Sequence, residues 1–179
     1  MSLIELMVSV FLAGIVLTMV MLLFMFGLRS FAAMGNYAEL NGQSRHALDV
    51  MSKEIRQSSH VLGAQSNGDA RWLIVANTNV VPAVTNIYSW AQGTGVMRWD
   101  RMQGGRHTIV TNLTSCDMWD FTMCIRSPDA KGVFPTTQDP SRCKLINMSW
   151  KCTRSILGKK VNSESVLTAE IVLRNKHEL

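Results

Sequence analysis

Residues 6–28 read LMVSVFLAGIVLTMVMLLFMFGL, and this stretch decides the fold of the chain. It contains no charged residue, and 19 of its 23 residues are apolar, the exceptions being Ser9, Gly14, Thr18 and Gly27. As an α-helix it spans about 34 Å, which matches the roughly 30 Å hydrocarbon core of a bilayer. We therefore expect a membrane-spanning helix or a helix buried in an assembly, and a purely soluble protein is excluded.

The residues that flank this run favour a permanent anchor over a discarded signal peptide. A signal peptide has a basic start, a shorter apolar stretch and a small-residue cleavage site. Here the acidic Glu5 precedes the run, and Arg29 ends it. Because the chain has no second run of this kind, we expect a single N-terminal anchor, followed by about 150 residues that form one domain.

Beyond Arg29 the helical pattern continues as an amphipathic stripe. Its apolar residues recur every three or four positions, and they are Phe31, Met34, Ala38, Ala47, Leu48, Met51, Ile55 and Leu62. This spacing predicts a helix that packs one face on a domain. No proline occurs before Pro82, so we expect one helix from about residue 2 to residue 61, roughly 90 Å long. The chain then divides into an apolar helix at 1–28, an amphipathic continuation at 29–62 and a globular domain at 63–179.

After residue 63 the apolar residues recur at every second position, which is the period of a β-strand. Short apolar or alternating runs occur at 72–76, 87–91, 96–101, 107–113, 119–125, 146–150 and 167–173, and Gln103-Gly104-Gly105 indicates a hairpin. Such strands form antiparallel sheets with one face shielded from solvent, and we expect the long helix to pack on that face. We therefore predict an α+β fold, in which a long N-terminal helix packs on an antiparallel β-sheet domain.

Four cysteines lie in one stretch of 37 residues, from Cys116 to Cys152. They lack the close pairs of zinc sites and the Cys-x-x-Cys-His motif of haem attachment, so we expect disulfides, with no metal and no cofactor. In an antiparallel hairpin, paired residue numbers share a nearly constant sum, which is 267 for Cys124–Cys143 and 268 for Cys116–Cys152. These nested bridges fit one register with a one-residue slip. The alternative is a pair of local bridges, Cys116–Cys124 and Cys143–Cys152. A spacing of eight or nine residues along an extended strand is too long for a bridge, whose Cα atoms must lie within about 7 Å of each other.

Charge and motif content narrow the class of function. The net charge is +5, but the basic residues are scattered, with Lys159-Lys160 the only adjacent pair, whereas nucleic-acid-binding proteins gather such charge on one face. The sequence lacks a nucleophile–base pair, metal-ligand spacing and a phosphate-binding loop, so we do not expect an enzyme. Two Asn-x-Ser/Thr triplets make Asn112 and Asn147 candidate glycosylation sites.

The first turn of the predicted helix, Ser2-Leu3-Ile4-Glu5, has two interpretations. A Ser-x-x-Glu sequence forms a capping box, in which Ser2 caps the helix and Glu5 reaches back to it. Alternatively, Glu5 faces the free amine of a neighbouring chain. Two unit charges 4 Å apart gain roughly 4 kcal/mol at an effective dielectric of 20, which is comparable to the roughly 3 kcal/mol cost of a carboxylate at mid-bilayer.

The opening Ser2-Leu3-Ile4-Glu5-Leu6-Met7, followed by some twenty apolar residues, resembles the mature N-terminus of type IV pilins and type II secretion pseudopilins. The resemblance implies that a prepilin peptidase removes a leader and N-methylates the new first residue, here Met1. It also implies that assembly machinery moves the subunit from the inner membrane into a helical filament of copies and other pilins, either an extracellular pilus or a periplasmic pseudopilus. Segments 6–28 would form its core, and Glu5 would neutralise the amine of an adjacent Met1.

Two further stretches, Ser44–Gln57 and Leu173–Asn175, resemble the PilW-like minor pilins and J-type pseudopilins. They imply an alternative role in priming or capping a pilus or a secretion pseudopilus. Many pilins have a proline where Leu22 stands here, and their helix melts between that proline and a glycine that matches Gly14. Because this chain keeps Gly14 as the one point of helix flexibility and lacks the proline, we predict less melting of the helix or none. An alternative from another class is a membrane-anchored periplasmic binding protein or enzyme.

Overall fold

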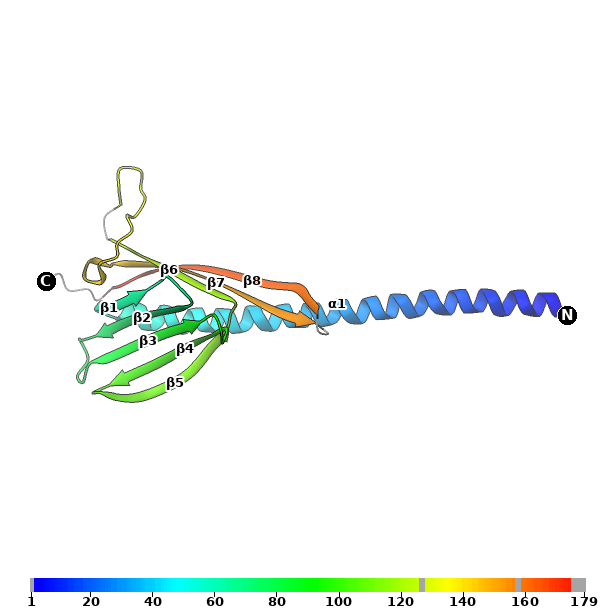
Figure 1. Cartoon of the computed structure of the whole chain (residues 1–179), viewed down its shortest axis with the longest axis horizontal. Helices are drawn as coiled ribbons and strands as arrows, with labels where there is room; N and C mark the ends of the chain where they lie inside the picture. The colour runs from blue at the N-terminus through cyan, green and yellow to red at the C-terminus, as the bar shows by residue number, and fades with distance from the viewer. Residues whose placement is uncertain (1, 126–127, 157–158, 175–179) are drawn as a thin grey trace.

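The computed structural model describes residues 2–125, 128–156 and 159–174. They form one long helix, α1, and two antiparallel sheets that lie beside its C-terminal half (Figure 1). The two sheets and the part of α1 that packs on them are called the head below. The predicted α+β architecture, a long N-terminal helix on antiparallel β-structure, is confirmed.

Helix α1 (Leu3–Gln57) is unbroken over its 55 residues. It ends at Ser58, whose backbone N–H bonds to the carbonyl oxygen of Ile55 at 3.1 Å. The end comes earlier than the predicted residue 61 because Ser59 already belongs to the sheet region. The backbone N–H of Ser59 donates to the carbonyl oxygen of Ala76 at 2.7 Å, which directs the chain away from the helix axis.

The C-terminal half of α1 packs on the sheets through one face. Its buried residues are Leu40, Ser44, Ala47, Met51 and Ile55, spaced three or four positions apart. The sequence analysis extended this packed stripe to Phe31, Met34 and Ala38, and this was wrong, because all three side chains are exposed. The apolar period continues along the helix, but the head reaches only to Leu40.

The larger sheet is a meander of five strands in sequence order, each antiparallel to the next. Its strands are β1 (His60–Gln65), β2 (Ala70–Asn77), β3 (Val84–Ala91), β4 (Val96–Gln103) and β5 (Arg106–Ser115). The predicted hairpin joins β4 to β5 through Gly104 and Gly105, whose φ values of 58° and 79° suit glycine. Strand β1 was missed because its residues continue the apolar spacing of the helix and show no alternation.

The smaller sheet has three strands, β6 (Met118–Cys124), β7 (Leu145–Ile156) and β8 (Lys159–Val172), in that order and antiparallel. A short 3-10 helix, η1 (Pro140–Arg142), precedes β7. Paired residue numbers in β6 and β7 sum to 269, as for Met118 with Lys151 and Cys124 with Leu145. The pairing of these two strands was predicted, but the register differs by one or two residues from the predicted sums.

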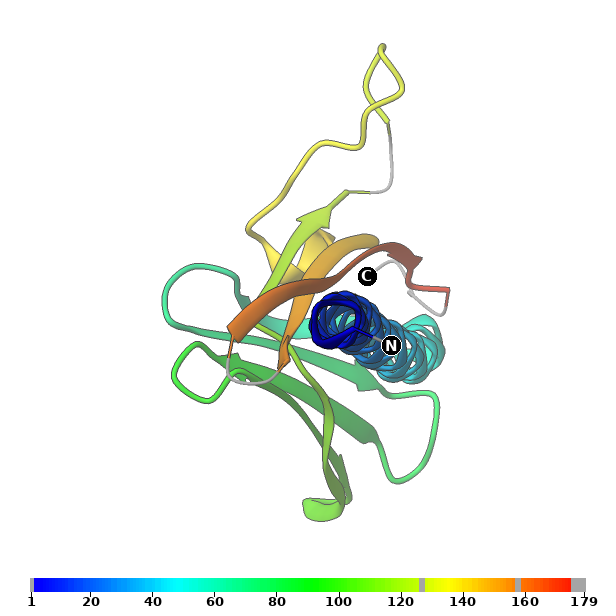
Figure 2. The same cartoon turned by 90° about the vertical axis from the view of Figure 1, so that its right-hand side faces the viewer.

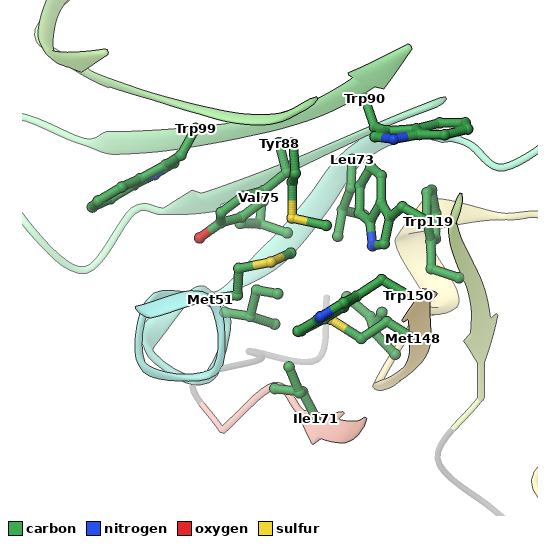
Figure 3. Close-up of a cluster of buried hydrophobic side chains, with 14 of the residues drawn as sticks. Met51, Leu73, Val75, Tyr88, Trp90, Trp99, Trp119, Met148, Trp150 and Ile171 are labelled. Atoms are coloured by element: carbon green, nitrogen blue, oxygen red, sulfur yellow. The ribbon is translucent and has the colours of Figure 1, made fainter. Parts of the chain in front are cut away.

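The core of the head lies between the two sheets and α1, and α1 seen end-on lies against both sheets (Figure 2). Trp119 and Trp150, which are paired across β6 and β7, are fully buried in it. They point toward Leu73 and Val75 of the larger sheet and Met51 of α1 (Figure 3). Because three elements contribute to one cluster, the core of the head is incomplete without α1.

A network of polar side chains also connects α1 to the larger sheet. The carboxylate of Glu54 on α1 lies 3.5 Å from Nη1 of Arg101 and accepts from Nδ2 of Asn86 at 3.3 Å. The indole N–H of Trp99 donates to Oδ1 of the same Asn86 at 3.0 Å. The side chain of Glu54 is 11% exposed, so these partners offset the cost of removing its charge from water.

Arg71 joins the two sheets. It lies on β2, where its guanidinium carbon is 5.5 Å from the centroid of the Trp90 ring. Its Nη1 reaches across to the smaller sheet, donating to the carbonyl oxygen of Trp119 and lying 3.3 Å from the carboxylate of Asp120. One side chain thus contacts the backbone and a side chain of β6 while it stacks on β3.

We predict that Arg71→Ala lowers the free energy of unfolding by about 2 kcal/mol, since it removes a cation–π contact and a charged hydrogen bond, while the half-exposed ion pair adds little. The full chain in detergent should then unfold about 5 °C lower. Arg98→Ala, at an exposed position on β4, is the matched control and should change stability by less than about 0.5 kcal/mol. Equal midpoints for the two variants would show that Arg71 does not join the sheets.

Candidate functional site

The N-terminal part of α1, residues 3–39, projects from the head as an isolated helix (Figures 1 and 2). Over residues 3–28 the large apolar side chains are between 40% (Ile15) and 82% (Leu3) exposed. Among the described residues, α1 is the helix long and apolar enough to cross a membrane. Monomeric soluble proteins rarely expose apolar patches of more than a few hundred Å², so this surface requires a cover of lipid or protein.

The polar side chains inside the apolar segment bond to the helix itself. The hydroxyl of Ser9 lies 2.9 Å from the carbonyl oxygen of Glu5, and that of Thr18 donates to the carbonyl oxygen of Gly14 at 2.8 Å. A hydroxyl without a partner is costly in an apolar environment, and these bonds remove that cost. The segment therefore suits an apolar surrounding along its whole length.

A capping box closes the N-terminal end of the segment. The backbone N–H of Ser2 donates to Oε2 of Glu5 at 2.9 Å, and the backbone N–H of Glu5 donates to Oγ of Ser2 at 3.4 Å. The first interpretation of Ser2 and Glu5 is thus observed within the single chain. Met1 lies outside the described residues, so the pairing of Glu5 with a neighbouring Met1 stays a prediction. The two roles are compatible, because a carboxylate has two oxygens and the cap uses Oε2.

Helix α1 continues without interruption through Gly14. A Cβ atom placed on Gly14 meets no atom within 4 Å, so packing inside this chain gives no reason for a glycine there. In the single chain the segment is a regular helix, and the behaviour of Gly14 in an assembly stays a prediction.

Between the apolar segment and the head, residues 29–39 form a stalk. Phe31, Met34 and Tyr37 are 76%, 70% and 51% exposed along it. Sequence reasoning assigned this region to the face that packs on the head, since its period is the same as that of the buried stripe. The structure instead shows that the apolar contact surface extends about 16 Å beyond the membrane-length run.

The four cysteines are buried and in the thiol form. The structure brings Cys116 and Cys152 together, with the Cys116 thiol hydrogen-bonded to the Cys152 sulfur. This hydrogen bond lowers the pKa of Cys152 to about 7, assisted by the Ser44 hydroxyl. Cys124 lies opposite Leu145, and its Sγ is 3.9 Å from Nδ2 of Asn147. Cys143 belongs to the core cluster, and its predicted bridge to Cys124 stays a prediction.

The two sequons differ in accessibility. Asn112 on β5 is exposed, whereas Asn147 on β7 is half-buried. The Nδ2 of Asn147, the atom that carries a glycan, lies 3.9 Å from the sulfur of Cys124. Of the two candidates, Asn112 is the one whose amide is open to a transferase.

Within residues 2–125, 128–156 and 159–174, no group of three His, Cys, Asp or Glu side chains is placed to hold a metal ion. Comparison of the chain with protein-family models, with characterised proteins and with solved structures finds no match. The geometry of α1 and the sequence of its first turns are therefore the features that indicate a function.

The apolar segment can be tested as a membrane anchor by placing two cations at its middle. Each arginine at the centre of a spanning helix costs about 3 kcal/mol, so we predict that the double substitution Leu17→Arg and Met21→Arg releases the chain from membranes in alkaline carbonate. The matched control, Phe31→Arg with Met34→Arg, changes the stalk and should leave the chain in the membrane fraction. Release of both variants, or of neither, would contradict an anchor at 6–28.

Proposed function

We propose that this chain is the structural subunit of a type IV pilus-like filament, in which the projecting segments of many copies bundle into the core and the heads form the surface. The observation that carries the proposal is the geometry of α1: a membrane-length apolar helix, uncovered by its own chain, joined without a break to a folded head. The pilin-like sequence at Ser2–Met7 supports the same function.

Assembly exchanges one apolar environment for another. Before assembly, lipid of the inner membrane covers residues 6–28, with the head outside the cytoplasm after prepilin peptidase has acted. In the filament, the same residues of neighbouring copies replace the lipid. A head-to-tail contact that does not close on itself gives an open helical filament, which is the symmetry that a pilus requires.

Glu5 supplies the specificity that an apolar contact lacks. The amine of Met1 in a neighbouring copy is the cation that would offset the cost of moving this carboxylate out of water. Because Glu5 lies on the first turn, pairing with a neighbour's first residue offsets two copies along the axis and sets their register. The capping box holds the carboxylate in a defined position before the neighbour arrives.

The stalk extends this packing beyond the membrane. Its exposed Phe31, Met34 and Tyr37 lie between the lipid boundary and the head, where neither lipid nor the head covers them. In a filament, neighbouring copies cover this zone. A lone membrane anchor has no use for apolar side chains there.

A second candidate role is a minor pilin or pseudopilin that primes or caps a pilus or a type II secretion pseudopilus. The resemblance of Ser44–Gln57 to PilW-like and J-type sequences favours it. The share of this subunit in sheared filaments, measured by mass spectrometry, separates the roles: a structural subunit dominates the filament mass, and a priming subunit is a trace component.

We predict that Glu5→Ala leaves a folded, membrane-inserted subunit but reduces incorporation into filaments at least tenfold, because the neighbouring amine loses its counter-charge. Incorporation is measured as the ratio of subunit in sheared filaments to subunit in the membrane fraction. Ser2→Ala is the matched control, since it removes the side-chain cap and leaves the carboxylate.

Equal effects of the two substitutions would reduce Glu5 to its capping role. Normal incorporation of Glu5→Ala would remove ion pairing from the mechanism altogether. An N-methylated Met1 in the same mass spectra is the expected mark of prepilin processing.

A further inference from the structure

The outer face of the smaller sheet carries a compact grid of polar side chains. Alternate residues of β6, β7 and β8 enter the core of the head, so the residues between them face away from α1. The grid has two rows across β6, β7 and β8, which are Asp120, Ser149 and Thr168, and then Thr122, Asn147 and Glu170. With strands about 4.8 Å apart, each row is about 10 Å long.

The grid surrounds a hollow in the surface of the head. The hollow has a volume of about 390 Å³, and all six side chains of the grid line it. This volume lies within the roughly 300–1,000 Å³ of sites that hold small molecules. The three strands therefore present one set of polar groups to a single small ligand.

Asp120 is held in place by the protein itself. Its Oδ1 accepts from the backbone N–H of Phe121 at 2.9 Å and lies 3.3 Å from Nη1 of Arg71. Within the described part of the chain, its second oxygen has no hydrogen-bond donor, and the side chain is 51% exposed. A carboxylate that is ordered before a ligand arrives loses little conformational entropy when it binds.

Asn147 lies at the centre of its row and has a free acceptor. Its Nδ2 is 3.9 Å from Sγ of Cys124, whereas its Oδ1 is buried and has no hydrogen-bond partner among the described residues. A buried amide oxygen without a donor is costly. Rotation of the amide about its last torsion would turn this oxygen toward a donor in the hollow.

The chemistry of the grid selects a ligand with several hydroxyl groups and no negative charge. The Ser and Thr hydroxyls of the grid donate and accept, whereas carboxylates accept alone. An anionic ligand would meet Asp120 and Glu170, and the cation of the adjoining row, Lys151, is already paired with Glu164 at 2.7 Å. The two carboxylates of the grid are two strands apart, and no metal-binding group occurs in the described part of the chain.

A protein partner fits this face less well than a small polar ligand does. The cores of protein interfaces gather aromatic residues, Met and Arg, and their polar residues lie at the rim. Here the polar rows are central, and Met118, Val166 and Val172 lie exposed in the rows at either end. This order suits a sugar ring, whose hydroxyls lie at its edge and whose C–H groups contact apolar side chains.

We infer that the outer face of the smaller sheet binds a neutral saccharide. Hydroxyls of the sugar donate to the carboxylates of Asp120 and Glu170 and accept from the hydroxyls of Ser149 and Thr168. The inference goes beyond the proposed filament role and does not depend on it, because every residue of the grid belongs to the head.

The test is isothermal titration calorimetry of the full chain in a polyoxyethylene detergent, because the sugar of an alkyl glycoside detergent would compete. The probes are glucose, galactose, mannose and N-acetylglucosamine, with glucuronate and galacturonate as acidic counterparts of the first two. We expect at least one neutral sugar to bind with a millimolar Kd and both uronates to bind at least about tenfold more weakly. Failure of all the neutral sugars to bind, or a uronate that binds as tightly as a neutral sugar, would overturn the inference.

Two substitutions that preserve side-chain shape locate the site. Thr168→Val removes one hydroxyl, Glu170→Gln removes one charge, and each should weaken binding about tenfold because a hydrogen bond to the sugar is lost or loses its charge. The matched control is Thr111→Val, at an exposed position on β5 of the larger sheet, and it should leave the Kd unchanged. Unfolding midpoints equal to that of the unsubstituted chain show that each variant is folded. An unchanged Kd for both grid variants, or an equal loss in the control, would place the sugar elsewhere and overturn the inference.

Discussion

The apolar side chains of residues 6–28 must be kept from water, and nothing in the described part of the chain covers them. Burying one Leu, Ile, Phe or Met side chain gains about 1.5–3 kcal/mol, so covering this segment is worth tens of kcal/mol. The net stability of a folded domain is about 5–15 kcal/mol. The cover of the N-terminal segment therefore dominates the energetics of the whole molecule. Lipid and copies of the same helix are both apolar covers, so the choice between them depends on smaller, specific interactions, of which the proposed ion pair at Glu5 is one.

One unbroken helix serves both the projecting segment and the head. Its C-terminal half contributes Met51 and Ile55 to the core and Glu54 to the network of polar side chains that connects α1 to the larger sheet. Because α1 has no break between Leu3 and Gln57, the position of the segment fixes the position of the head. In the proposed filament, the register that Glu5 sets at one end is thereby transmitted to the surface at the other.

The sequence allowed the fold class, the apolar segment, the hairpin through Gly104 and Gly105 and the pairing of β6 with β7 to be predicted, because each depends on a local period or a turn residue. Strand β1 was missed, since Ser59, which follows the C-cap of α1, is bound to the distant residues Ala76 and Thr78. The exposure of Phe31 and Met34 was also missed, because the period that predicts a packed face does not say how far the head extends.

Contacts between residues that are far apart in the sequence could not be predicted either. Nothing local in the sequence indicates that Arg71 contacts Trp119 and Asp120. These contacts depend on how the two sheets meet, which is set by the core and not by any one strand. The capping box of Ser2 and Glu5, by contrast, is local, and it was available from the spacing alone.

The most direct test of the central claim is electron cryomicroscopy of filaments sheared from cells that produce this chain. The account predicts a continuous central bundle of helices made by residues 6–28, with the heads outside it and the stalks covered by neighbouring copies. Cells that hold the chain solely as dispersed monomers in the membrane, or filaments whose centre is built from the heads, would contradict it.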